Sequence, residues 1–297
     1  MNRLSFPSFA IKAAYYRLAA KKANLPGRTF DTFGRLCGLS LLLQKKFHPQ
    51  LLLNPVSCVR YFEFDYCQKN LLPALEGQNI LDISSPYLFG FYLCRKNKLT
   101  YQYINPDEND LRQIRHLKKY LRFNSEYSID PVDATSLPYK DSSIDSIISI
   151  SVIEHVNSRG DTQVMSEMWR VLKPGGRMLL TFPVKKEYEE EYRATNVYHL
   201  SVDEKDGAYF FQRYYDRNAI EKRLLSAIDN VKILSCELFG EINEGDFDAY
   251  EHRWMKNGLA ETIKDPLYIS THMKYYKTIE DIPGMAVMGI TLVKLDQ

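Results

Sequence analysis

The sequence predicts an α/β protein built on a doubly wound, mostly parallel β-sheet. Two observations about the middle of the chain support this prediction. Between about residues 78 and 183, short β-rich runs alternate with helical patterns, which is the order of elements in a parallel sheet covered by helices. The runs are also nearly continuously apolar, as expected of strands that are buried on both faces.

Each element of this region has its own signal. The β-rich runs are bounded by turn residues, and the helical patterns repeat apolar residues at helical spacing. We expect strands at residues 79–84, 99–104, 127–133, 144–151 and 176–183. We expect helices at residues 87–96, 107–121 and 161–172.

The flanking regions are less regular. The sequence pattern predicts a helical N-terminal extension at residues 1–70 and the main domain at residues 71–297. A polar, tyrosine-rich loop at about 185–215 and a long segment at about 240–282 are expected as insertions in that domain. The remaining elements expected there are a helix at 216–228 and strands at 231–240 and 284–295.

Composition argues against several classes of protein. The chain has 39 Lys and Arg against 37 Asp and Glu among 297 residues, so no nucleic-acid partner is expected. Its five cysteines form no CxxC pair or Cys/His cluster, which indicates no metal site and no disulfide framework. The longest apolar run, LSLLL, is far too short to span a bilayer. A reducing cytoplasm is the simplest expected location.

Positive charge is concentrated near the N-terminus. Residues 1–50 contain nine basic residues and a single acid, Asp31. The helical pattern at 9–25 is basic and amphipathic, and such a helix either contacts an anionic membrane or docks on its own domain. Both alternatives stay open at this point.

The turn after the first strand has an unusual composition for a nucleotide site. Ligands of open α/β sheets bind at the carboxyl ends of the strands, and the first strand ends near Asp82. Ser84, Ser85 and Pro86 follow in place of the glycines that a dinucleotide pyrophosphate requires, which argues against NAD and FAD. We expect Ser85 to cap the next helix and Pro86 to occupy its first position.

Two later segments carry a family resemblance. They are DATSLPYKDSSIDSIISISVIEHV at 133–156 and SEMWRVLKPGGRMLLTFPV at 166–184. With NILDIS at 79–84, they resemble the class I (Rossmann-like) S-adenosylmethionine-dependent methyltransferases that act on small molecules. The resemblance implies a seven-stranded sheet with an antiparallel last strand, S-adenosyl-L-methionine as cofactor, and methyl transfer to oxygen or nitrogen of a small-molecule or lipid-like acceptor.

The resemblance also implies a set of cofactor contacts. Asp133 and the Ala134 amide would bind the adenine, and Asp82 would lie near the amino group of the methionine part. The turn at Ser84 and Ser85 would present amides to the carboxylate, since this cofactor has no phosphate.

Contacts at two further strand ends follow from the same resemblance. The family places an acid at the end of the second strand for the ribose hydroxyls, and Tyr103 stands there in this chain, with Asn105 and Asp107 close enough to substitute. Ser151, at the end of the fourth strand, is a further expected contact. Because the serine turn and Tyr103 depart from the family pattern, a non-catalytic protein of this fold, acting as a binding or partner subunit, is the alternative.

The reaction itself needs few protein groups. His155, beside Glu154 at the end of the fourth strand, is the candidate base, and the alternative is that it packs against the sheet. The aromatic segments 208–216, with Arg213, and 250–258 either line a substrate pocket or pack over the sheet.

Overall fold

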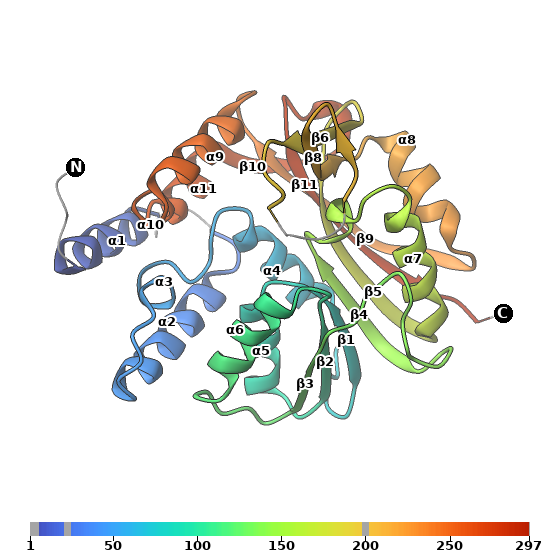
Figure 1. The fold of residues 1–297 in the computed structure, drawn as a ribbon, viewed down its shortest axis with the longest axis horizontal. Helices are drawn as coiled ribbons and strands as arrows, with labels where there is room; N and C mark the ends of the chain where they lie inside the picture. Colours follow the sequence, from blue (N-terminus) through green and yellow to red (C-terminus); the bar gives the residue numbers. More distant parts are fainter. Residues whose placement is uncertain (1–5, 21–24, 198–201, 297) are drawn as a thin grey trace.

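The computed structural model describes residues 6–20, 25–197 and 202–296. These residues form a central eight-stranded sheet with helices on both faces, and a separate three-stranded sheet (Figure 1). The predicted α/β class and the doubly wound arrangement are therefore confirmed.

The central sheet is parallel over most of its width. β1 to β5 are parallel to one another where they pair, whereas β11 is antiparallel to both β5 and β9. The antiparallel last strand is thus confirmed, and an eighth strand, β10, extends the expected seven at one edge. In spatial order the strands are β10 (Met273–Tyr276), β9 (Val231–Glu241), β11 (Ala286–Lys294), β5 (Leu172–Val184), β4 (Ile144–Ile150), β1 (Asn79–Ile83), β2 (Thr100–Ile104) and β3 (Glu126–Asp130).

The register of the parallel strands places the carboxyl ends of β1, β2 and β4 side by side. Asp82 of β1 pairs with Tyr103 of β2 and with Ile148 of β4. The residues that follow these strands therefore meet at the same edge of the sheet, where ligands of this fold bind.

The two faces of the sheet carry separate hydrophobic cores. Successive strand residues alternate between them, so that Ile80 belongs to one core and Leu81 to the other. The first core is covered by α4 (Arg60–Asn70), α5 (Tyr87–Lys96) and α6 (Glu108–Lys118), and the second by α7 (Gly160–Val171).

The N-terminal helices are α1 (Phe6–Ala20), α2 (Arg28–Leu43) and α3 (Pro49–Leu53). Phe30 of α2 packs on Tyr92 of α5, with ring centroids 4.4 Å apart. Tyr66 of α4 shares a hydrogen bond of 2.9 Å with Thr291 of β11. Side chains from α2 and α4 therefore contribute to the core of the domain.

Residues 185–197 and 202–215 contain strands where a loop was expected. They contain β6 (Glu189–Arg193), β7 (Glu204–Lys205) and β8 (Ala208–Tyr214), which pair as an antiparallel sheet in the order β6-β8-β7. Charged side chains on β6 and β7 hide the apolar alternation that identifies a strand in sequence. The helix expected at 216–228 is also irregular: α8 (Arg217–Ala219) is followed by a π-helical turn at 220–224 and a 3₁₀ turn at 225–227.

The segment at 240–282 contributes α9 (Asp246–Asn257), α10 (Leu259–Thr262), α11 (Asp265–His272) and the edge strand β10. Buried Asp265 joins it to the N-terminal part, because its carboxylate accepts hydrogen bonds from the Cys58 amide at 2.9 Å and the Tyr250 hydroxyl at 2.8 Å. Among the described helices, none has the length and apolar character needed to cross a membrane.

Candidate functional site

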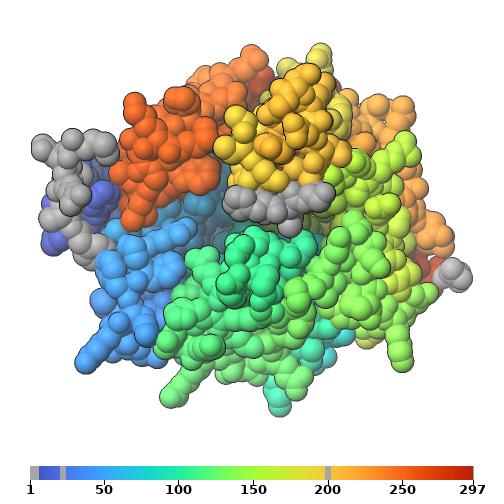
Figure 2. Space-filling view, in the orientation of Figure 1, coloured from blue at the N-terminus to red at the C-terminus, as the bar shows by residue number. Residues whose placement is uncertain are grey.

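A cavity of about 880 Å³ lies at the carboxyl ends of β1, β2 and β4. All of the residues predicted for the site line this cavity, with the exception of Asp82. In the space-filling view, the green segment near residues 105–135 and the yellow segment near residue 210 face each other across the front of the molecule (Figure 2). The cavity itself is lined by the loops that follow β1, β2, β3 and β4.

The β1 turn uses serine where related nucleotide sites use glycine. Ser84 has a φ of 53°, and its amide and hydroxyl both donate to the Ile104 carbonyl at 2.9 Å. A left-handed backbone costs an L-residue about 1–2 kcal/mol, and these two hydrogen bonds offset that cost. The serine turn therefore has the backbone that a glycine would supply.

The sequence predicts that Ser85 caps the next helix, and the structure shows that this prediction is wrong. α5 begins at Tyr87, its N-cap is Pro86, and no side chain caps it. The Ser85 hydroxyl instead accepts a hydrogen bond of 3.1 Å from the Ile150 amide, which ties the turn to β4.

Asp82 lies behind the turn and has a structural environment. Its side chain is fully buried, Oδ1 accepts from the Ser85 amide at 2.9 Å, and Oδ2 accepts from the Tyr101 hydroxyl. Burial raises the pKa of Asp82 to about 6. The expected contact with the cofactor amino group is therefore corrected: Asp82 supports the turn from inside.

The acidic side chains closest to the end of β2 come from the N-terminal end of α6. The Asn105 side chain accepts a hydrogen bond of 2.8 Å from the Asp107 amide, and Asp107 caps α6 by accepting from the Asn109 amide at 2.8 Å. Tyr103, almost fully buried, occupies the position of the family acid. Asp110 also lines the cavity, and burial, with the nearby Asp107, raises its pKa.

The loop after β3 presents a carboxylate at the cavity edge. Asp133 Oδ1 accepts from the Thr135 amide and the Thr135 hydroxyl, each at 2.8 Å. Ala134 packs into the core beside it. These contacts fix the direction of the exposed Asp133 side chain and of the peptide that follows.

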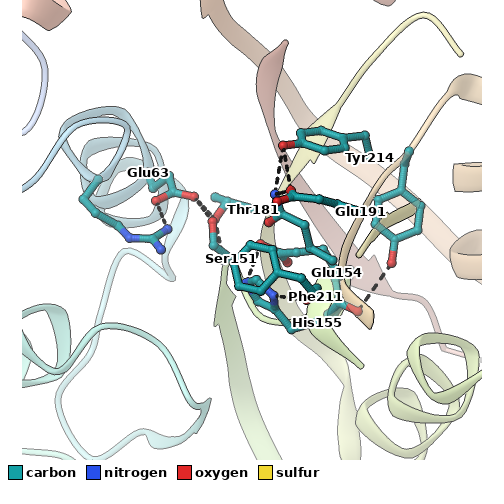
Figure 3. A network of polar contacts seen from close by, with 12 residues as sticks. Glu63, Ser151, Glu154, His155, Thr181, Glu191, Phe211 and Tyr214 are labelled. Carbon is teal, nitrogen blue, oxygen red and sulfur yellow. Dashed lines mark hydrogen bonds and ion pairs between the residues drawn. The ribbon is translucent and has the colours of Figure 1, made fainter. Parts of the chain in front are cut away.

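The end of β4 is held by an acid from α4. Glu63, fully buried, accepts hydrogen bonds from Ser151 Oγ at 2.5 Å and Thr181 Oγ1 at 2.9 Å, and its other oxygen binds Arg60 (Figure 3). Ser151 has a φ of 49°, so a second left-handed serine lies at the cavity. Strained backbone of this kind persists where the surroundings fix it, and it is frequent at functional sites.

Glu154 and His155 form a 3₁₀ turn, η1 (Ile153–His155), directly after β4. Burial raises the pKa of Glu154 to about 8 and lowers the pKa of His155 to about 4. Both side chains are therefore neutral near pH 7, and the 3.8 Å between His155 Nε2 and Glu154 Oε1 joins two uncharged groups.

The tautomer of His155 follows from its neighbour on β8. Nδ1 lies 2.7 Å from the Phe211 carbonyl oxygen, which can only accept, so Nδ1 carries the proton and Nε2 the lone pair (Figure 3). His155 lines the cavity, and its side chain is 20% exposed. A ring with this tautomer can accept a hydrogen bond from a ligand, whereas its low pKa makes it a weak base.

The two aromatic segments lie outside the cavity, and residues 252–257 of the second segment are exposed. No described residue of 208–216 or 250–258 lines the cavity. The guanidinium of fully buried Arg213 donates to the Val156 carbonyl at 2.5 Å, and Tyr250 binds Asp265. The packing alternative therefore holds for Arg213, which supports the loop after η1, and for Tyr250.

Several cavity residues carried no recognisable sequence signal. Gln50 of α3 and Arg60 of α4 come from the region read as an extension, and Arg159 and Gln163 follow the fourth strand. The run YFEFDY around Glu63 does place an acid between aromatic residues, which could have indicated a buried carboxylate. Within the described ranges, no group of His, Cys, Asp and Glu has a geometry suited to a metal ion.

Comparison with known proteins agrees with this architecture. Residues 88–180 match the family described as "Methyltransferase domain". The chain is 38% identical over 89 residues to methyltransferase GfsG of Streptomyces halstedii, covering 30% of this chain and 31% of that protein. It is 47% identical over 49 residues to a putative methyltransferase of Encephalitozoon cuniculi, covering 16% and 23%. The matches thus span less than a third of either curated relative.

Solved structures extend the likeness beyond the matched segment. The crystal structure of the MccD protein superposes with a TM-score of 0.51 at 13% identity, covering 80% of this chain and 99% of that one. Phosphoethanolamine N-methyltransferase 2 of Haemonchus contortus superposes with a TM-score of 0.50 at 16% identity, covering 87% and 57%. The resemblance to methyltransferases is thus supported by the domain match at 88–180, and the likeness to the solved structures shows the fold.

Proposed function

We propose that the cavity binds S-adenosyl-L-methionine and that the protein transfers its methyl group to oxygen or nitrogen of a small-molecule or lipid-like acceptor. One observation is the main support: residues from four separate segments, predicted as cofactor contacts from family motifs, line a single cavity at the carboxyl edge of the sheet. Its volume suits a ligand of this size together with part of an acceptor.

The chemistry of the lining fits each part of the cofactor. Asp133 and the Ala134 amide are suited to the adenine, and the carboxylates of Asp107 and Asp110 to the ribose hydroxyls. The backbone at Ser84 and Ser85 is suited to the methionine carboxylate, and Arg60 adds a positive charge on the same cavity. The family has an acid where this chain has Tyr103. On this proposal, Asp107 and Asp110 at the start of α6 take the place of that acid.

Bound at this site, the cofactor supplies an activated methyl group on a sulfonium. The protein then has to orient the acceptor and exclude water. His155 Nε2, as a neutral hydrogen-bond acceptor, would align an acceptor hydroxyl or amine, while its low pKa makes complete proton removal before transfer unfavourable. We infer a positioning role with partial proton acceptance.

Calorimetric titration with S-adenosylmethionine and S-adenosylhomocysteine tests the binding step. We expect saturable binding, and replacing Asp133 by Ala should weaken it by about 1–3 kcal/mol through loss of a hydrogen bond. Asp141→Ala is the matched control, because this acid is 76% exposed and lies outside the cavity lining.

The results separate the enzyme from the non-catalytic alternative. Absence of heat with millimolar ligand would contradict cofactor binding, and equal affinities for Asp133→Ala and Asp141→Ala would contradict the adenine assignment. Incubation with cell extract and methyl-labelled cofactor should then give a labelled small molecule. A protein that binds the cofactor but labels nothing in extract would favour a binding or partner subunit.

A further inference from the structure

The outer face of α2 exposes a stripe of leucines. Leu36, Leu39 and Leu43 recur at helical spacing and are 60%, 49% and 87% exposed, and Leu42 beside them is 45% exposed. Single exposed apolar residues are ordinary, but four leucines on one helical surface are unusual for a face in contact only with water.

The opposite face of α2 already forms part of the core. Phe30, Cys37 and Leu41 are buried there, and Gly34 lies against Pro55 and Leu88. Contacts with the domain therefore fix the orientation of α2. The four leucines lie on the face of α2 that does not take part in these contacts.

α1 repeats the same arrangement. Ile11, Tyr15 and Leu18 lie at spacings of four and three residues and are 72%, 63% and 65% exposed, while Ala13 and Ala20 on the opposite side are buried. Both helices lie in the blue region at one end of the molecule (Figure 1). We call these six side chains, Ile11, Tyr15, Leu18, Leu36, Leu39 and Leu43, the outer apolar surface.

The charges around the outer apolar surface have one sign. Lys12, Arg28 and Lys45 are exposed on the same helices and the loop that follows them. The single acid among the described residues before residue 51, Asp31, is buried and paired with Arg35 at 2.6 Å. The described residues before residue 51 therefore carry exposed cations and no exposed carboxylate.

The outer apolar surface is connected to the candidate site. α3 follows α2 directly, and Gln50 of α3 lines the cavity. α2 also packs on α5, whose first residue, Tyr87, lines the cavity from the other side. A flat partner on the outer face of α2 would thus lie one helix away from the site.

We propose that the outer apolar surface binds an anionic lipid bilayer. Leucine and tyrosine side chains would enter the interface, and the surrounding lysines and arginines would pair with anionic headgroups. A second copy of the chain would bring like charges together on this surface, which disfavours the self-associated alternative. Membrane binding requires neither cofactor nor catalysis, so its test is independent of the proposed methyl transfer.

Flotation of the full-length chain with lipid vesicles provides the test, without added cofactor. We expect the protein to float with vesicles of phosphatidylcholine mixed with phosphatidylserine, and to remain in solution with phosphatidylcholine alone. Raising the salt concentration should weaken binding. Replacing Lys12 or Lys45 by Ala should weaken binding about fivefold for each lysine removed.

Leu39→Asp should reduce binding by on the order of tenfold or more, because it removes an apolar side chain that would enter the bilayer and adds a negative charge. The matched control is Leu234→Asp on β9, a leucine that is 44% exposed against 49% for Leu39. Equal urea midpoints for the two variants would show that both are folded.

Two results would overturn the proposal. One is flotation that does not depend on phosphatidylserine or is equal for the two leucine variants. The other is a dimer of the wild-type chain, seen by light scattering, that Leu39→Asp converts to a monomer while the wild type fails to float.

Discussion

Replacing Glu63 by Ala should strongly destabilise the protein, although Glu63 lies in the N-terminal region and outside the strands of the sheet. Its carboxylate accepts from Ser151 Oγ at 2.5 Å and Thr181 Oγ1 at 2.9 Å while fully buried. A hydrogen bond to a charged group contributes about 1.5–3 kcal/mol, and removing the acid also removes the cost of burying it. We therefore expect the free energy of unfolding to fall by about 3 kcal/mol.

The control is Asp65→Ala in the same helix. Asp65 pairs with Lys69, whose side chain is 59% exposed, so the pair contributes less than about 1 kcal/mol. Urea unfolding of both variants gives the comparison. Because Glu63 holds the left-handed Ser151 at the cavity, Glu63→Ala should also weaken S-adenosylhomocysteine binding. Equal losses for the two variants would refute the structural role of Glu63.

Three further changes test the site. Asp82→Ala should lower the free energy of unfolding by about 3 kcal/mol, because the Ser85 amide and the Tyr101 hydroxyl lose their buried acceptor. A loss below about 1 kcal/mol in urea unfolding would contradict this role of Asp82. Glu154 has a pKa raised to about 8, so its stabilising contribution is complete below its unfolded pKa and is lost as pH rises through 8. Glu154→Gln should therefore flatten the fall in stability measured in urea between pH 5 and 9, and an unchanged slope would count against the buried neutral acid. His155→Ala should slow methyl transfer several-fold with unchanged cofactor affinity, and an unaltered rate would remove its positioning role.

The central strands were predictable because burial on both faces requires apolar runs. NILDI, TYQYI and IDSIISI each form a strand, as expected. Family motifs then placed Asp133, Ala134 and Ser151 at the cavity. Residues near strand ends can be located in this way because the strands themselves fix where the chain leaves the sheet.

Other features depend on contacts between distant segments and carry no local pattern. β10 is a short edge strand, MKYY, that pairs with β9 after a helical excursion. The charged strands β6 and β7 resemble a loop in sequence because neither buries an apolar face. Glu63 could not be assigned to the site from sequence, because only the docking of α4 on the sheet brings it to Ser151.

Asp82 shows the limit of motif transfer. Its position at the end of β1 was correctly predicted, but the Tyr101 hydroxyl and the Ser85 amide occupy its carboxylate inside the protein. A strand-end acid can either face the ligand or support the turn that faces it. Only the side-chain direction distinguishes the two, and sequence does not supply that direction.

The most direct test of the central claim is a crystal structure of the protein with S-adenosylhomocysteine. We predict ligand density in the cavity at the ends of β1, β2 and β4, with the adenine beside Asp133 and Ala134 and the carboxylate end at Ser84 and Ser85. Density at another site, or an empty cavity in crystals saturated with ligand, would contradict the proposed cofactor site.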